Sequence, residues 1–156
     1  WLTGKALISG FYLNELLIRL FHAYDPHPDI YAIYARALAQ LHVSPDAVEP
    51  ALRLFEFDLL QALGFGVVLN KEQDKQSVLL PDHFYTVKPD YGVVYVAPTL
   101  SQDRQTLCWS GKSLSAIENR DFSDPQTQRD AKQLIRLLLQ PLLGDRPLKT
   151  RQYCFL

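Results

Sequence analysis

Residues Pro50–Gly64 read PALRLFEFDLLQALG, and this stretch decides the fold. One apolar row recurs at spacings of three and four, as on the core-facing side of a helix, and consists of Leu52, Phe55, Leu59 and Leu63. An adjacent row mixes a cation with bulky apolar groups: Arg53, Phe57 and Leu60. Pro50 suits the first helical position, where its missing N–H has no partner to lose, and Gly64 suits the C-terminal stop. The stretch predicts an amphipathic helix. Its first row is expected to lie in the core, whereas the pattern does not decide whether the second row is buried or exposed.

Two further helical patterns precede this helix. Apolar residues at helical spacing predict one helix over about residues 5–23 and another from about residue 30 to residue 41. Asp25-Pro26-His27-Pro28 separates them, because proline cannot donate to a helical ladder, and Ser44-Pro45-Asp46 marks the next turn. Helices joined by such short loops are expected to be antiparallel neighbours.

The pattern after Gly64 changes from helical to extended. Short β-branched and aromatic runs at 67–69, 84–87 and 93–96 predict a small antiparallel sheet, with a turn at 88–92. A short helix is then expected from Ser110 or Gly111 through Ile117, and a longer one from Pro125 to a stop at Gly144. The expected fold is mainly α (α+β): a single domain over 1–156, with helices at about 5–63 and 111–143 and a β-rich insertion at about 65–97.

Length and composition favour an ordinary globular domain. The 156 residues are 47% hydrophobic and 21% charged, enough to bury a core without a disulfide or metal. No apolar run is long enough to span a membrane, and no secretory leader is visible. The formal net charge of −1 hides an uneven distribution, because residues 129–156 hold six basic and two acidic side chains. Such a basic terminus can attract nucleic acid at short range even when the whole chain is neutral.

Signatures of metal binding and catalysis are weak. Cys108 and Cys154 have no zinc-like spacing, which favours reduced thiols in a cytoplasmic protein. The cluster His22, Asp25, His27 and Asp29 is more simply a polar turn between helices. Ser110-Gly111-Lys112-Ser113 imitates the end of a phosphate-binding loop, but Thr106 stands where the upstream glycine is required, so helix capping explains it better. We expect neither an enzyme nor a cofactor.

Three segments together resemble the RecO family of bacterial recombination mediators. They are GFYLNELL at 10–17, ALRLFEFDLL at 51–60 followed by LGFG at 63–66, and LGDRPLKTR at 143–151. The resemblance implies the C-terminal, helical part of such a protein, without the family's N-terminal OB-fold. Many members bind zinc through four cysteines after the third helix. Here that position reads NKEQDK at 70–75, so the chain is similar to the metal-free branch, and the inserted β subdomain is expected to hold no zinc.

The resemblance also implies a function and its partners. RecO proteins anneal complementary single strands, bind the C-terminal tail of the single-stranded DNA-binding protein SSB and support RecA loading with RecR. The implied role is therefore a DNA repair and recombination module that binds single-stranded DNA and SSB, cytoplasmic and nucleoid-associated, without a membrane. The alternative is a purely protein-docking helical domain, in which the basic terminus caps helix ends and pairs with the acidic first sixty residues.

Two sets of candidate site residues follow. The expected DNA-binding residues are the six terminal cations: Arg129, Lys132, Arg136, Arg146, Lys149 and Arg151. The first three share one helical face, although cations near a helix end can be purely structural. The expected docking site for the SSB tail, which ends in a carboxylate beside a phenylalanine, consists of Arg53, Phe57, Leu60 and Leu63. The competing interpretation is that Arg53 pairs with Glu49 or Glu56 and that the apolar groups are core.

Overall fold

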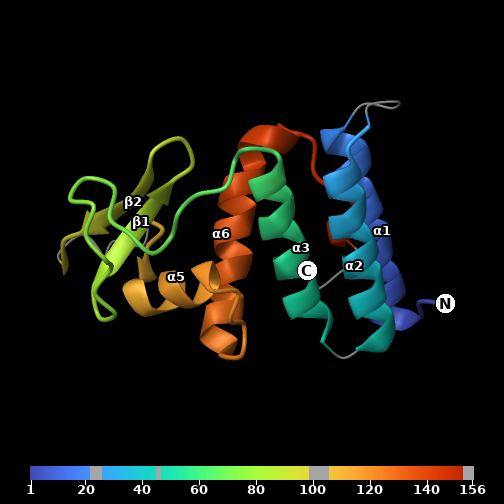
Figure 1. Ribbon diagram of the computed structural model, residues 1–156, viewed down its shortest axis with the longest axis horizontal. Coiled ribbons are helices and arrows are strands. Elements are labelled where there is room, and N and C mark those ends of the chain that lie inside the picture. Colours follow the sequence, from blue (N-terminus) through green and yellow to red (C-terminus); the bar gives the residue numbers. More distant parts are fainter. Residues whose placement is uncertain (22–25, 45–46, 99–105, 153–156) are drawn as a thin grey trace. The chain divides into compact units, whose positions relative to one another are not determined.

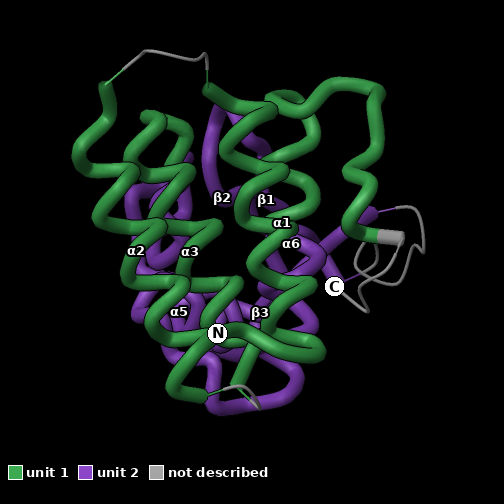
Figure 2. The backbone as a smooth tube through the Cα atoms, turned by 90° about the vertical axis from the view of Figure 1, so that its right-hand side faces the viewer, with its two compact units in different colours: residues 1–66, 135–156 green, residues 67–134 purple. Residues whose placement is uncertain are grey.

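A computed structural model describes residues 1–21, 26–44, 47–98 and 106–152. The chain divides into two compact units, one of residues 1–66 and 135–156 and the other of residues 67–134 (Figure 2). No helix in the described ranges is long and apolar enough to cross a membrane. The mainly α (α+β) fold class is confirmed.

The first unit is built on three helices, α1 (Gly4–Leu20), α2 (Pro28–Val43) and α3 (Val48–Ala62). They lie side by side in Figure 1, and α1 packs against both α2 and α3. The C-terminal half of α6 (Pro125–Leu143) and the 3₁₀ helix η1 (Lys149–Gln152) complete the unit. Fully buried apolar side chains form its core: Leu13, Leu16, Leu41, Leu52, Phe55 and Leu59. The apolar row predicted for the third helix is thus largely confirmed as core, although Leu63 is half-buried.

The prolines differ from expectation in their helical positions. Pro28 was expected to belong to the stop after the first helix, but it begins α2, because its fixed φ suits a first helical turn. Pro50 lies at the third rather than the first position of α3, still within the turn whose N–H groups lack helical partners. Gly64 ends this region in the left-handed conformation, at φ +81°, as its C-terminal role requires.

The second unit holds a three-stranded antiparallel sheet in the order β2-β1-β3. Strand β1 (Phe84–Lys88) pairs with β2 (Gly92–Val96) and with the short β3 (Trp109–Ser110). Residues 67–69 were expected to form a strand, but they pair with no strand in the described residues, because an apolar run alone does not supply a ladder partner. Instead the Leu69 N–H donates to Glu118 at 2.9 Å.

The segment that imitates a phosphate loop is a helix cap. The Ser110 hydroxyl accepts from the Ser113 N–H at 3.1 Å and begins α5 (Gly111–Glu118). A Cβ at Gly111 would lie 2.2 Å from the Leu80 carbonyl oxygen, so glycine is needed for close packing. Capping and packing therefore explain the Ser-Gly-Lys-Ser motif.

Helix α6 (Pro125–Leu143) runs from the second unit into the first. Its buried side includes Leu134, Ile135 and Leu138, as predicted, and also Leu139, whereas Leu142 is half-buried. Gly144 follows at φ +64°, which confirms the predicted stop. Pro141 lies within the last turn, where few later residues depend on the helical ladder.

A buried polar triad joins α1 to α3. The Arg53 Nη2 donates to Glu56 Oε1 at 3.2 Å, and the Tyr12 hydroxyl donates to the same oxygen. Arg53 Nε lies 2.9 Å from Glu56 Oε2, but at an angle too bent for a hydrogen bond, so this contact is electrostatic. Burial raises the pKa of Glu56, while the cation of Arg53 opposes that rise. Breaking such a pair leaves an uncompensated charge in the core.

We expect Glu56→Gln to lower the free energy of unfolding by about 3 to 5 kcal/mol, because the buried Arg53 loses its counter-charge. The matched control is Asp58→Asn on the same helix, whose partner Arg36 is exposed. An exposed pair contributes at most about 1 kcal/mol. Urea denaturation measures both. Equal losses in the two variants would contradict a structural role for the buried pair.

Candidate nucleic-acid interface

Glu15 of α1 fixes the start of η1. Its Oε1 accepts from the Lys149 N–H at 2.7 Å, and its Oε2 accepts from the N–H and the hydroxyl of Thr150 at 2.8 and 2.6 Å. These N–H groups open the 3₁₀ helix and lack partners within it, so a carboxylate satisfies them as an N-cap would. Residue 15 therefore anchors residues 149 and 150, far away in the sequence.

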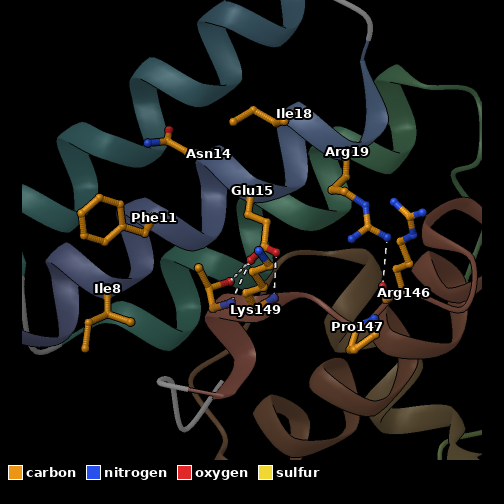
Figure 3. A pocket seen from close by; sticks show the side chains of 10 residues that line it. Ile8, Phe11, Asn14, Glu15, Ile18, Arg19, Arg146, Pro147 and Lys149 are labelled. Atoms are coloured by element: carbon orange, nitrogen blue, oxygen red, sulfur yellow. Dashed lines mark hydrogen bonds between the residues drawn. The ribbon is translucent and has the colours of Figure 1, made fainter.

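Arg19, one turn further along α1, holds the other end of the same connection. Its Nη2 donates to the carbonyl oxygens of Leu143 and Arg146, at 2.8 and 2.9 Å. Leu143 is the last residue of α6, so this cation sits at the negative end of the helix. Figure 3 shows the hydrogen bonds of Glu15 and the bond from Arg19 to Arg146 on one side of α1. The fully buried Leu148 adds an apolar anchor between them. We call Glu15 and Arg19 the α1 clamp.

The electrostatics of Glu15 agree with this role. Partial burial alone would raise its pKa, but the hydrogen bonds from Thr150 and Lys149 outweigh that effect, and the Arg19 cation assists them. The net result is a pKa below the ordinary value of 4.5. The carboxylate is therefore charged whenever the clamp is closed at neutral pH.

Three of the predicted cations line one hollow of about 350 Å³ beside the clamp. Arg136 comes from α6, Arg146 from the connection after it and Arg151 from η1. Asp145 also lines the hollow, yet in the described part of the chain no ion pair joins it to a cation. We call Arg136, Arg146 and Arg151 the arginine hollow. A small hollow lined by three arginines suits a small, multiply charged anion such as a phosphate.

The other predicted cations lie elsewhere. Lys149 is exposed and lines a different groove, which shares Arg146 and Pro147 with the arginine hollow. Arg129 and Lys132 belong to the second unit and do not line the arginine hollow. Arg129 is exposed and donates to Gln126 at 2.7 Å. The structure thus brings together half of the six residues.

The predicted SSB-tail site is largely interior. Arg53, Phe57 and Leu60 are 2%, 5% and 1% exposed, and Leu63 is half-buried at the end of α3. The Arg53 guanidinium already faces Glu56. The docking assignment stays a prediction, with the condition that an incoming carboxylate must compete with Glu56 for this cation.

The sequence pattern did not predict the α1 clamp of Glu15 and Arg19. Glu15 and Arg19 are four residues apart, so they share one helical face, which was the available signal. Apart from the Thr150 hydroxyl, their partners are backbone groups distant in sequence, which no side-chain pattern reveals. The described residues hold no group of three or more His, Cys, Asp or Glu that could bind a metal. His22 and Asp25 of the candidate turn cluster, and Cys154, lie outside the described residues.

Fold and site together define a class: a mainly α domain with an inserted antiparallel sheet and an arginine-lined hollow at its C-terminal end. The family model described as "Recombination protein O C terminal" matches residues 2–152. The chain belongs to the RecO family, as this match over nearly its whole length shows.

Several relatives named DNA repair protein RecO support the assignment. The chain is 40% identical to the protein of Coxiella burnetii (strain RSA 331 / Henzerling II) over 154 residues, 99% of this chain and 64% of the relative. It is 40% identical to that of Dechloromonas aromatica (strain RCB) and 41% to that of Pseudomonas aeruginosa (strain LESB58), over 97% of this chain and 62% of each relative. The chain thus spans less than two thirds of their length.

We expect the α1 clamp to be sensitive to acid through Glu15. Because its pKa is lowered in the folded state, its contribution to stability is full above the unfolded pKa and is lost as the pH falls through the folded pKa. Glu15→Ala should cost about 1 kcal/mol at pH 7, as loss of a helix cap does. Glu15→Gln should cost less, since one acceptor oxygen remains.

Thermal unfolding of the parent and both variants between pH 7 and pH 3 measures the effect. The difference between parent and Glu15→Ala should shrink below about pH 4.5, the ordinary value for this carboxyl group. A difference that stays constant down to pH 3 would show that the charge of Glu15 contributes nothing to the clamp.

Proposed function

We propose that this chain is a DNA repair module of the recombination-mediator type that binds single-stranded DNA without reading its sequence. One observation carries the proposal: arginines from α6, the following connection and η1 converge on one hollow, held in place by the α1 clamp. Arginine forms charge-assisted, often bidentate, hydrogen bonds with phosphate. The naming of its relatives as DNA repair proteins supports the same role.

Two of the terminal cations, Arg146 beside the hollow and Lys149 in the neighbouring groove, are available to a ligand. In the described ranges, no ion pair joins Arg146 or Lys149 to a carboxylate, and both side chains are exposed. The acidic first sixty residues do meet the basic terminus, through Glu15, but at backbone N–H groups. Glu15 keeps its negative charge, but the neighbouring Arg19 cation offsets it, so the anchor as a whole adds no net negative charge to this surface.

The proposal includes partners but no chemical catalysis. We include SSB and RecR as partners and a role in RecA loading because of the family assignment, and strand annealing would use the same phosphate contacts. The SSB tail would dock near Arg53 only if it displaced the Glu56 contact. Because Arg53→Ala would leave Glu56 buried without its counter-charge, a loss of tail binding in that variant would also reflect a damaged core.

The rival function is protein docking without DNA, in which the terminal cations serve only the fold. The salt dependence of oligonucleotide binding distinguishes the two functions. Each phosphate contact releases counterions, so binding to DNA weakens steeply as the salt concentration rises.

We expect the triple variant Arg136→Gln, Arg146→Gln and Arg151→Gln to weaken binding of single-stranded oligonucleotides of any sequence. The slope of log affinity against log salt should become shallower by up to about 2, since each contact to a single strand contributes about 0.7. Fluorescence anisotropy at several salt concentrations measures both quantities.

Two further variants test whether the effect is specific to the arginine hollow. Arg36→Gln, on α2, removes the same charge away from the hollow and should leave the slope unchanged. Arg129→Gln with Lys132→Gln tests whether the DNA path extends along α6. If the folded triple variant keeps the affinity and slope of the parent, the arginine hollow is not the DNA site.

A further inference from the structure

An apolar groove borders the arginine hollow and has no role in the function proposed above. It has a volume of about 1130 Å³ and lies between one face of α1 and the start of η1. Ile8, Phe11 and Ile18 supply its apolar lining on α1, and Pro147 lines it from the C-terminal connection (Figure 3). Phe11 is 56% exposed and Ile18 is 77% exposed, although both are large apolar residues. Exposed apolar surface of this kind commonly marks a binding site.

The groove is apolar at one end and cationic at the other. Figure 3 shows Ile8 and Phe11 together toward the N-terminal end of α1, and Arg19 and Arg146 together further along the helix. Lys149 adds a second exposed cation. The carboxylate of Glu15 lies between them and offsets one of the three cations Arg19, Arg146 and Lys149, which leaves the lining of the groove with a net charge of 3 − 1 = +2. The groove therefore presents aromatic surface beside positive charge.

The groove adjoins the arginine hollow, because Arg146 and Pro147 line both. A ligand that fits both must carry repeated negative charges and, close to them, flat apolar groups. Single-stranded DNA has this chemistry, since each unpaired base offers two stacking faces beside a phosphate. In a duplex the base faces are stacked on one another and cannot reach an aromatic side chain.

We propose that this groove receives unpaired nucleobases, one of which stacks on Phe11, while the phosphates of the same strand contact Lys149 and the arginine hollow. The inference rests on the single-stranded DNA binding proposed above and adds to it a preference for unpaired over paired strands. Phe11 is thus assigned as a base-contacting residue, and the cations as phosphate-contacting residues.

The test measures anisotropy with three labelled probes of one length: an oligothymidylate, the same backbone without bases, and a duplex. Phe11→Ala should weaken oligothymidylate binding at least about five-fold, the lower end of the loss measured when a stacking side chain is removed. It should change binding of the abasic strand and the duplex less than two-fold and leave the salt slope unchanged. Lys149→Gln should instead weaken binding of all three probes.

Further variants separate stacking from simple apolar contact and from loss of fold. Phe11→Trp should keep parental affinity, whereas Phe11→Leu should behave like Phe11→Ala. Tyr31→Ala, on α2, removes an exposed aromatic ring that does not line the groove and should have no effect. Circular dichroism should show all variants folded, since Phe11 is a surface residue.

Several results would overturn the proposal. One is an equal loss of abasic and oligothymidylate binding in Phe11→Ala. Another is DNA binding that depends on the arginine hollow but not on Phe11, which would leave the proposed function intact. Phe11-dependent binding of an acidic peptide without any effect on DNA would assign the groove to a protein partner. Loss of a dimer in Phe11→Ala would assign it to a second copy of the chain. A parent that binds no DNA would reject the function and this inference together.

Discussion

The α1 clamp is the interaction on which the proposed site depends. A carboxylate and a guanidinium, one turn apart on the same helix, hold the start of η1 and the end of α6. Helix ends expose N–H groups at one terminus and carbonyl groups at the other, so an acid and a base are the complementary partners. Without the clamp, residues 144–151 would follow α6 as a short loop tethered chiefly by Leu148. With it, two arginines distant from Arg136 in sequence line the same hollow.

A second polar feature lies deeper and has a different role. Arg53, Glu56 and Tyr12 are buried between α1 and α3, where an unpaired member would be costly. In the sequence this arginine appeared in a mixed row beside Phe57 and Leu60, a pattern compatible with either docking or the core. The structure places the guanidinium against Glu56, one of the two partners in the competing interpretation. The helical period located the residue, but only the packing of α1 on α3 determines its exposure.

Much of the fold could be predicted because its signals are local. Apolar periodicity, the glycines at 64 and 144 and the Ser110 cap identified the helices and their ends. The exceptions required long-range information. Pro28 could end one helix or begin the next, and residues 67–69 resembled a strand although no neighbouring strand pairs with them in the described residues. For the site, the composition identified the basic terminus. It could not show which of its cations line the arginine hollow, because Arg146, which lines it, and Arg129, which does not, are the same residue type.

The anchoring of η1 has a consequence for how this surface can change. Glu15 contacts the main chain at residues 149 and 150, and the only side chain it contacts there is the Thr150 hydroxyl. Every residue except proline offers the same N–H group, so the anchor is indifferent to the side chain at position 149. Mutation can therefore exchange, add or remove charge at this position without releasing the backbone. The backbone of residue 149 attaches η1 to α1, and its side chain is left to contact a ligand. The side chain can therefore change in evolution while the attachment is kept.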